Sequence, residues 1–395
     1  MQIPAIQTTK IVNGDRIKQA RELRGLTQVE LASRTNVSQP AIAQLEQQSG
    51  LAFAPSLELL EAIALQLGFP LSFFTQESAP EFPLGSLLYR KKSSLKTIDK
   101  NKVRQLARLA YEMAERMASR LKMPPLTLPA ITDNNPIIAA HLMRSSLGLS
   151  PDTPVKNLIH QLEKNGLFVI AIPYTIDEHD SFSLWVSDQS LPKPVIVLST
   201  GKPGDRQRFN VAHELAHVVM HRAFQGTLKD METQANQFAA ELLMPAETMK
   251  QQIIPPVTLS QLAALKPKWG VSIQALTKRA YDLGIITYRQ YTYLFQQITE
   301  RGWRIREPEN LDITAEKPRA LRKMAEVLYG TPINIGKLAS DMQIPVSLAE
   351  LILSTHAEKP EMPTKPKEEP KSETKGHFKQ KNLPNNVDSI RSKRR

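Results

Sequence analysis

The sequence predicts a mainly α-helical fold with a small β-sheet, an α+β architecture spread over more than one domain. Apolar residues recur at helical spacing through most of the chain. The period shortens from roughly 3.6 to 2 only in the middle, where LFVIAIPY, FSLWVS and PVIVLS indicate about three short strands. A length of 395 residues leaves room for two or three domains of roughly 100 to 200 residues each.

The amino-acid composition indicates which class of protein this is and which kinds of partner it can bind. A hydrophobic content of 41% with 23% charged residues is ordinary for a globular protein. The formal net charge of +12 favours a polyanionic partner, nucleic acid ahead of an anionic membrane surface. The absence of cysteine excludes disulfides, thiolate nucleophiles and cysteine-bound zinc. The sequence shows neither a signal-peptide pattern nor an apolar run of about eighteen residues, so we expect a cytoplasmic protein without a membrane partner.

After a flexible lead-in over residues 1–14, residues 15–76 are expected to form five short helices. The first ends at Gly25, which accepts a positive φ. Thr27 and Glu30 form a capping box for the second helix. Ser38 is a suitable N-cap for the third, with Pro40 in its first turn. Because only three or four residues separate the second helix from the third, the spacing is that of a helix-turn-helix.

In a helix-turn-helix the second helix enters the major groove of DNA, and its early residues meet the base edges. Those residues here are Gln39, Ala41 and Gln44. A glutamine amide offers a donor and an acceptor together, which suits an adenine edge. Gln28, at the start of the preceding helix, is placed for a backbone phosphate. Phosphate contacts are also expected from basic residues of the first helix, namely Arg16, Lys18, Arg21 and Arg24.

The stretch LTQVELASRTNVSQPAIAQLEQ resembles the signature of the lambda-repressor-like helix-turn-helix domain of the Xre family, and PSLELLEAIALQLGFPLSFF resembles its last two helices. The resemblance implies a five-helix DNA-binding domain over residues 15–76, in which Glu46 faces inward. It also implies a double-stranded DNA operator as partner, bound by a homodimer on paired half-sites. The same fold occurs as a protein-binding module, in which Gln39 and Gln44 would be solvated surface.

The rest of the chain divides at changes of composition. Residues 77–123, with a proline-rich joint and a long basic helix, are expected to link two folded units. Residues 124–257 hold two helices, the three strands and two further helices, and residues 258–355 are expected to form a helical C-terminal domain. Residues 356–395 have many lysines and prolines and cannot bury a core, so we expect a disordered basic tail.

The stretch VAHELAHVVMHR carries the chemistry of the middle unit. His213 and His217, four residues apart, share one face of a helix and can bind one zinc ion through their imidazoles. Glu214 adjoins the first of them, near where the open position of the metal would hold water, and can act as general base. A third protein ligand is needed. Without cysteine, the candidates are a distant carboxylate, His221 or an acid from the sheet.

RFNVAHELAHVVMH and ETQANQFAAELLMP resemble the ImmA/IrrE family of zinc metallo-endopeptidases over about residues 151–245. The resemblance implies a zincin-like domain over residues 124–257, in which Glu232, three residues before the AN pair, completes a His, His, Glu site. LKPKWGVSIQALTKRAYDLGII and RGWRIREPE also resemble the C-terminal half of such peptidases when they are fused to an Xre module. Asn236 either orients a metal ligand or is an ordinary packing amide. His221 is either a ligand or a packing residue.

Three further expectations concern substrate and support. One of the strands FSLWVS and PVIVLS is expected to hold an extended peptide by edge pairing. His179 and Arg206 are candidates for stabilising an oxyanion. His141 and His160 lie on amphipathic helices and are expected to be structural.

Three functions fit these patterns. The leading one is a sequence-specific DNA-binding transcriptional regulator whose zinc-dependent endopeptidase domain cleaves a partner repressor or the regulator itself. In the second, the zincin domain of the regulator is a non-catalytic sensor of metal or ligand. In the third, the protein is the antitoxin of a toxin-antitoxin pair.

Overall fold

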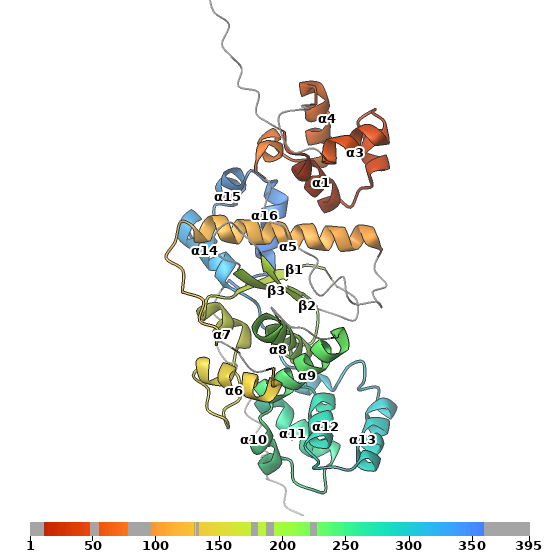
Figure 1. The fold of residues 1–395 in the computed structure, drawn as a ribbon, viewed down its shortest axis with the longest axis vertical. Helices are drawn as coiled ribbons and strands as arrows, with labels where there is room; N and C mark the ends of the chain where they lie inside the picture. Colours follow the sequence, from red (N-terminus) through yellow and green to blue (C-terminus); the bar gives the residue numbers. More distant parts are fainter. Residues whose placement is uncertain are drawn as a thin grey trace, which may run out of the picture. The chain divides into compact units, whose positions relative to one another are not determined.

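The computed structural model describes residues 12–47, 55–77, 96–129, 131, 134–174, 181–186, 193–221 and 227–358. All of these belong to one compact unit, Met1–Glu361. They form helices around a three-stranded sheet (Figure 1), which confirms the predicted fold class. The expected tail lies almost wholly outside the described residues, as do most of the lead-in and the proline-rich joint.

The N-terminal region contains the five expected helices: α1 (Gly14–Leu23), α2 (Gln28–Arg34), α3 (Gln39–Gln47), α4 (Leu57–Leu67) and the 3-10 helix η1 (Leu71–Thr75). The predicted capping box is confirmed, because the Thr27 hydroxyl accepts from the Glu30 amide and the Glu30 carboxylate accepts from the Thr27 amide. Gly25 has the predicted positive φ, 65°. Ile17, Leu31, Ile42, Ile63 and Phe73 are fully buried at the centre of this region.

The long helix α5 (Thr97–Ala118) forms as predicted, but it is a core element as well as a connection. Both of its faces are occupied: it contacts α1 on one side, and β1 and α14 on the other. Arg16 of α1 and Glu112 of α5 form a buried ion pair, with Nη1 and Oε2 2.6 Å apart. Arg108 of α5 likewise binds Asp15. Two of the basic residues that suggested a linker, Arg104 and Arg108, are thus paired with acids of α1.

The sheet consists of β1 (Phe168–Ile172), β2 (Ser181–Val186) and β3 (Lys193–Ser199) in the order β1-β3-β2. β1 runs parallel to β3, with Phe168 opposite Val195, and β2 runs antiparallel to β3, with Ser183 opposite Ile196. Alternate residues of each strand face opposite sides. Phe182 and Leu184 of β2 therefore join the core that contains α5, while Ser181 and Ser183 face the opposite side.

The second core lies on that opposite side of the sheet. It contains α6 (Pro136–Ser146), α7 (Leu158–Lys164), α8 (Gly204–Met220), α9 (Leu228–Leu243), α10 (Ala246–Gln252), α11 (Leu259–Trp269), α12 (Ile273–Asp282) and α13 (Tyr288–Glu300). The short helix η3 (Glu309–Leu311) follows. The remaining helices, α14 (Ala320–Tyr329), α15 (Ile335–Met342) and α16 (Val346–Ser354), return to the core of α5. The helices expected as one C-terminal domain are thus divided between two cores.

Glu163 connects α7 with the start of α14. The half-buried side chain of Glu163, next to the end of α7, accepts the backbone N–H groups of Arg319 and Ala320 at the start of α14. Among the described residues, no helix is long and apolar enough to cross a membrane.

Candidate functional site

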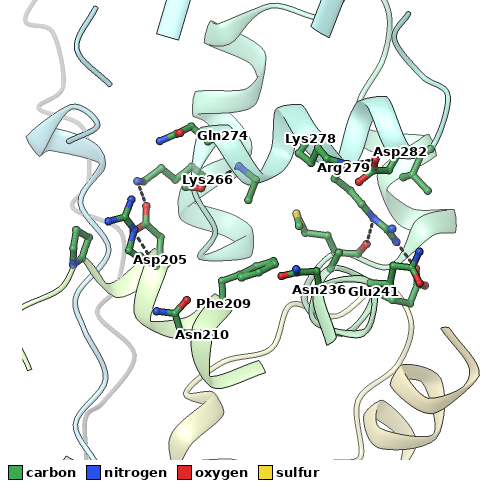
Figure 2. Close-up of a pocket in the computed structure, with 18 of the residues that line it drawn as sticks. Asp205, Phe209, Asn210, Asn236, Glu241, Lys266, Gln274, Lys278, Arg279 and Asp282 are labelled. Carbon is green, nitrogen blue, oxygen red and sulfur yellow. Dashed lines mark hydrogen bonds and ion pairs between the residues drawn. The ribbon is translucent and has the colours of Figure 1, made fainter. Parts of the chain in front are cut away.

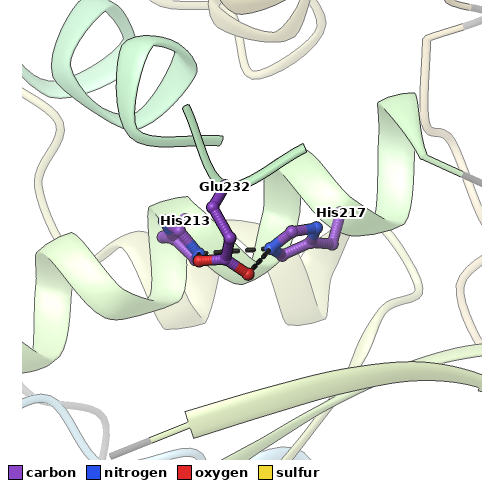
Figure 3. A group of neighbouring side chains, drawn as sticks. All are labelled: His213, His217 and Glu232. Carbon is purple, nitrogen blue, oxygen red and sulfur yellow. Dashed lines mark hydrogen bonds and ion pairs between the residues drawn. The ribbon is translucent and has the colours of Figure 1, made fainter. Parts of the chain in front are cut away.

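His213, His217 and Glu232 converge in the second core, and Figure 3 shows their side chains pointing at one another. The two histidines lie one turn apart on α8, and the glutamate comes from the first turns of α9. Nε2 of His213 lies 3.3 Å from Oε2 of Glu232, Nε2 of His217 lies 3.5 Å from Oε1, and the two Nε2 atoms are 3.1 Å apart. The structure therefore brings Glu232 next to both histidines, as the family resemblance implied.

These distances fit a tetrahedral metal. With zinc bonds of about 2.0 to 2.1 Å, neighbouring ligand atoms of a tetrahedral site lie about 3.3 to 3.4 Å apart. The three measured separations, 3.1, 3.3 and 3.5 Å, bracket that value. The histidine side chains are about one-tenth exposed and the Glu232 side chain is 43% exposed, so the trio is held by protein on one side and open on the other.

Hydrogen bonds orient the rings of His213 and His217 so that both Nε2 atoms face the carboxylate of Glu232. Nδ1 of His213 lies 3.1 Å from Oδ1 of Asn236. Nδ1 of His217 lies 2.9 Å from Nδ1 of His221, whose Nε2 in turn lies 3.1 Å from Oε1 of Gln234. Because the two amide oxygens only accept, His213 donates to Asn236, His221 donates to Gln234, and His217 donates to His221. Both histidine rings then carry their lone pair on Nε2, as a metal bound at Nε2 would require.

His221 therefore contacts a member of the trio and does not join it. Burial, with the neighbouring His217, lowers the pKa of His221 to about 4, so the ring is neutral at pH 7 and can accept from His217. Asn236 likewise has the orienting position, one of the two alternatives that the sequence left open. One partner that sequence reasoning missed is Gln234, for which the sequence carries no local signal.

Glu214 points from α8 toward the sheet. Its carboxylate is fully buried; Oε2 accepts the Ser183 hydroxyl at 2.7 Å, and the Ser181 hydroxyl lies 3.5 Å from Oε1. Both serines belong to β2, the edge strand that was one of the two expected to hold a peptide. The sequence did contain a signal for them, because two serines at alternate positions of an otherwise apolar strand face the same side.

The remaining predictions concern two oxyanion candidates, Arg206 and His179, and two histidines expected to be structural, His141 and His160. Arg206 is on α8 seven residues before His213, which is about 10 Å along the helix axis. His179 lies outside the described residues. His141 binds Glu241 through Nε2, at 2.9 Å, and His160 is exposed on α7. None of the four is a member of the converging group that the described residues contain.

The glutamines at the helix-turn-helix form a chain of hydrogen bonds. Gln39, at the first position of α3, donates from Nε2 to Oε1 of Gln28 at 2.8 Å, and Gln28 donates to Oε2 of Glu46 at the same distance. Glu46 is buried and also binds Arg21. The amide of Gln28 thus supports Gln39 from behind, a contact absent from the sequence-based prediction. Ala41 is half-buried and Gln44 is exposed on the same helix.

Three of the four arginine and lysine residues expected to contact phosphate do not have free side chains. Arg16 and Arg21 are buried and paired with Glu112 and Glu46. Arg24 donates to the carbonyl oxygen of Leu67. For Arg16 and Arg21 the prediction was wrong, because it ignored acids distant in sequence that meet the inner face of α1. Arg24 is half-buried and is not paired with an acid among the described residues, so its phosphate contact stays a prediction. Lys18 remains half-exposed.

Comparison with known proteins agrees with both regions. A family described as helix-turn-helix matches residues 17–74, and a peptidase family described as IrrE N-terminal-like domain matches residues 162–281. The chain joins a helix-turn-helix domain to an IrrE N-terminal-like domain. Both resemblances drawn from the sequence are thereby confirmed at the level of the domain.

Two individual proteins are also similar. The immunity repressor protein of Bacillus phage phi105 is 42% identical over 64 residues, which are 16% of this chain and 42% of that repressor. The chain thus spans less than half the length of this curated relative. The crystal structure of Bacillus thuringiensis PlcR in complex with the peptide PapR7 and DNA matches 87% of this chain and 95% of that chain at 16% identity, with a TM-score of 0.14. So low a TM-score does not establish a shared fold.

Proposed function

We propose that this protein is a sequence-specific DNA-binding regulator whose IrrE-like domain binds zinc through His213, His217 and Glu232 and hydrolyses a peptide bond. The observation that carries the proposal is the convergence of two correctly oriented imidazoles and a carboxylate at the separations of a tetrahedral site. Two histidines and a glutamate are a ligand set used by catalytic zinc enzymes, which keep a fourth position open.

Each residue then has a defined task. When bound, zinc supplies Lewis acidity that lowers the pKa of water and polarises a carbonyl group. Glu214 takes the proton of the attacking water and passes it to the leaving amide nitrogen, while Ser183 holds its carboxylate in place. Asn236 and His221 hold the two ligand rings. The edge strand β2, which pairs only with β3 among the described strands, pairs on its other edge with an extended peptide, whose source is a partner repressor or this chain itself.

In the N-terminal domain, Gln39, Ala41 and Gln44 meet the bases of a double-stranded operator, and Gln28 holds Gln39 in position. The similarity to the phi105 immunity repressor over 64 residues supports a role as a repressor. A homodimer on two half-sites is the arrangement that a helix-turn-helix usually requires.

Metal analysis tests the zinc site. Purified wild type is expected to hold about one zinc per chain, and His217→Ala and Glu232→Ala to hold almost none, because each removes one of three protein ligands. His160→Ala is the matched control, since this exposed histidine lies outside the trio. Wild-type protein that takes up no zinc, even when zinc is added during purification, contradicts the proposal.

One observation favours a second candidate, a non-catalytic sensor. The Glu214 carboxylate is fully buried and bonded to Ser183, so the side chain must become accessible before it can reach water at the metal. Comparing peptide fragments from cells that express wild type or Glu214→Gln separates the two candidates. Loss of specific fragments with Glu214→Gln supports the hydrolase. Unchanged fragments, together with zinc-dependent operator binding in both proteins, support the sensor.

A further inference from the structure

A large cavity lies beside the metal centre. Its volume is about 1220 Å³, and its walls come from α8 and α9 on one side and from α11, α12 and the segment after α13 on the other. None of the three converging side chains lines it. Figure 2 shows Phe209, Asn210 and Asn236 on one wall, with Lys266 and Gln274 on the other. The volume exceeds what most small-molecule sites need, about 300 to 1000 Å³.

Among the described residues, Arg206 is the one charged group of the wall for which no ion pair is seen. The others form ion pairs among the lining residues: Lys266 with Asp205 and Glu307, Arg279 with Glu241, Lys278 with Asp282, and Arg306 with Asp312. The guanidinium of Arg206 lines the cavity, is exposed, and has no hydrogen bond or ion pair to any residue within the described ranges. The lining carries five cations and five carboxylates, and Lys266 is shared by two of the carboxylates, so the ligand group that pairs with Arg206 is an anion.

The lining of the cavity also contains two aromatic rings. Phe209 lies one turn beyond Arg206 along α8, and Trp303 contributes a second half-buried ring to the lining. An aromatic body can pack on such rings while its acidic group binds the guanidinium, which forms two parallel hydrogen bonds to a carboxylate or sulfonate. Hydrogen-bonding amides nearby include Gln237 and Gln274. The wall thus matches an aromatic anion better than a sugar or a cation.

Asn236 connects the cavity with the metal centre. It is exposed and lines the cavity, and its Oδ1 lies 3.1 Å from Nδ1 of His213. We propose that this cavity binds a small aromatic anion through Arg206, and that the ligand weakens metal binding by competing for the amide of Asn236. The second half of this proposal rests on the proposed zinc site, while the first half stands without it.

The test uses two fluorescent probes that differ in charge. 8-Anilinonaphthalene-1-sulfonate is an aromatic anion, and N-phenyl-1-naphthylamine is the same ring system without the sulfonate. The full-length protein is expected to bind one sulfonate probe per chain. Arg206→Gln is expected to weaken that binding about tenfold to a hundredfold, the range for a lost hydrogen bond to a charged group, and to leave binding of the neutral probe unchanged. Arg289→Gln is the control, because Arg289 is exposed on α13 and does not line the cavity.

Equal binding of the sulfonate probe by wild type and Arg206→Gln overturns the cavity site, as does an equal loss in Arg289→Gln. The coupling is measured as zinc affinity in a chelator buffer with and without the sulfonate probe. We expect the probe to weaken zinc binding about tenfold, since loss of a partner of a ligating histidine costs about that much. Because the coupling between two sites is reciprocal, zinc is expected to weaken binding of the sulfonate probe by the same factor. An unchanged zinc affinity overturns the coupling. A protein that binds the probe but no zinc refutes the proposed function and not the cavity site.

Discussion

One of the buried carboxylates at the contact between the DNA-binding domain and α5 is that of Glu112. Glu112 accepts from Nη1 of Arg16 at 2.6 Å and from Nε2 of Gln19 at 3.0 Å, and the side chains of Arg16 and Glu112 are 2% and 7% exposed. Glu112→Gln keeps the shape and removes the charge, which leaves the guanidinium buried without its counter-ion. Removing one partner of such a pair costs about 3 to 5 kcal/mol.

The lower end of that range applies here, because Arg16 keeps its hydrogen bonds to the carbonyl oxygen of Glu77. A loss of about 3 kcal/mol raises the population of locally open states about 150-fold. Hydrogen exchange of the α1 and α5 amides measures this opening segment by segment. The amides of α8, in the other core, are expected to change little.

Glu115→Gln provides the control on the same helix. Glu115 binds Lys193 of β3, and the two side chains are 21% and 42% exposed, so we expect a loss below about 1 kcal/mol. If α1 exchanges at the wild-type rate in Glu112→Gln, or accelerates equally in both variants, then the buried pair does not hold the domain and the reasoning is refuted.

Three other predictions follow from the site and its surroundings. Burial raises the pKa of Glu163 to about 7, so between about pH 4.5 and 7 the folded protein retains a proton that the unfolded chain releases. Stability in urea should therefore fall by up to about 3 kcal/mol as the pH rises through that window, and an undiminished slope in Glu163→Gln would contradict this assignment. Asn236→Ala should weaken zinc binding about tenfold to a hundredfold in chelator competition, whereas its neighbour variant Gln237→Ala should not; equal effects would exclude an orienting role. Gln39→Ala should cost about 1 to 3 kcal/mol of operator binding and little of nonspecific DNA binding, measured by titration at fixed salt; an equal loss on both DNAs would exclude base contact.

Local chemistry in the sequence was sufficient to predict several elements. The capping box at Thr27 and Glu30 and the left-handed Gly25 depend on neighbours within a few residues, so their geometry follows from the sequence alone. The same holds for His213 and His217, whose spacing of four residues fixes them on one face of α8. Glu232 was assigned through a family resemblance, and no spacing rule would have selected it among the acids of the chain.

Long-range pairing limited the prediction. Arg16 has the same local pattern as a phosphate-binding arginine, and its partner Glu112 lies 96 positions away. Nothing near either residue identifies the pair, so the sequence predicted a basic linker where the structure has a buried contact. Ser183 and Glu214 are similarly 31 positions apart, and only the antiparallel pairing of β2 with β3 shows which side of the strand faces α8.

A continuous series of packed elements connects the metal centre with the DNA-binding domain. Glu214 of α8 binds Ser183 of β2; the sheet leads to β1, where Phe168 packs against Tyr111 of α5; and α5 carries Glu112. Packing alone carries no coupling unless one of these elements has two arrangements. A hydrolase that cleaves a separate repressor needs no such series, whereas a sensor does. If the IrrE-like domain is a sensor, Glu112→Gln should loosen α1 and therefore abolish the effect of zinc on operator binding. If the domain is a hydrolase, the same variant should leave peptide cleavage intact.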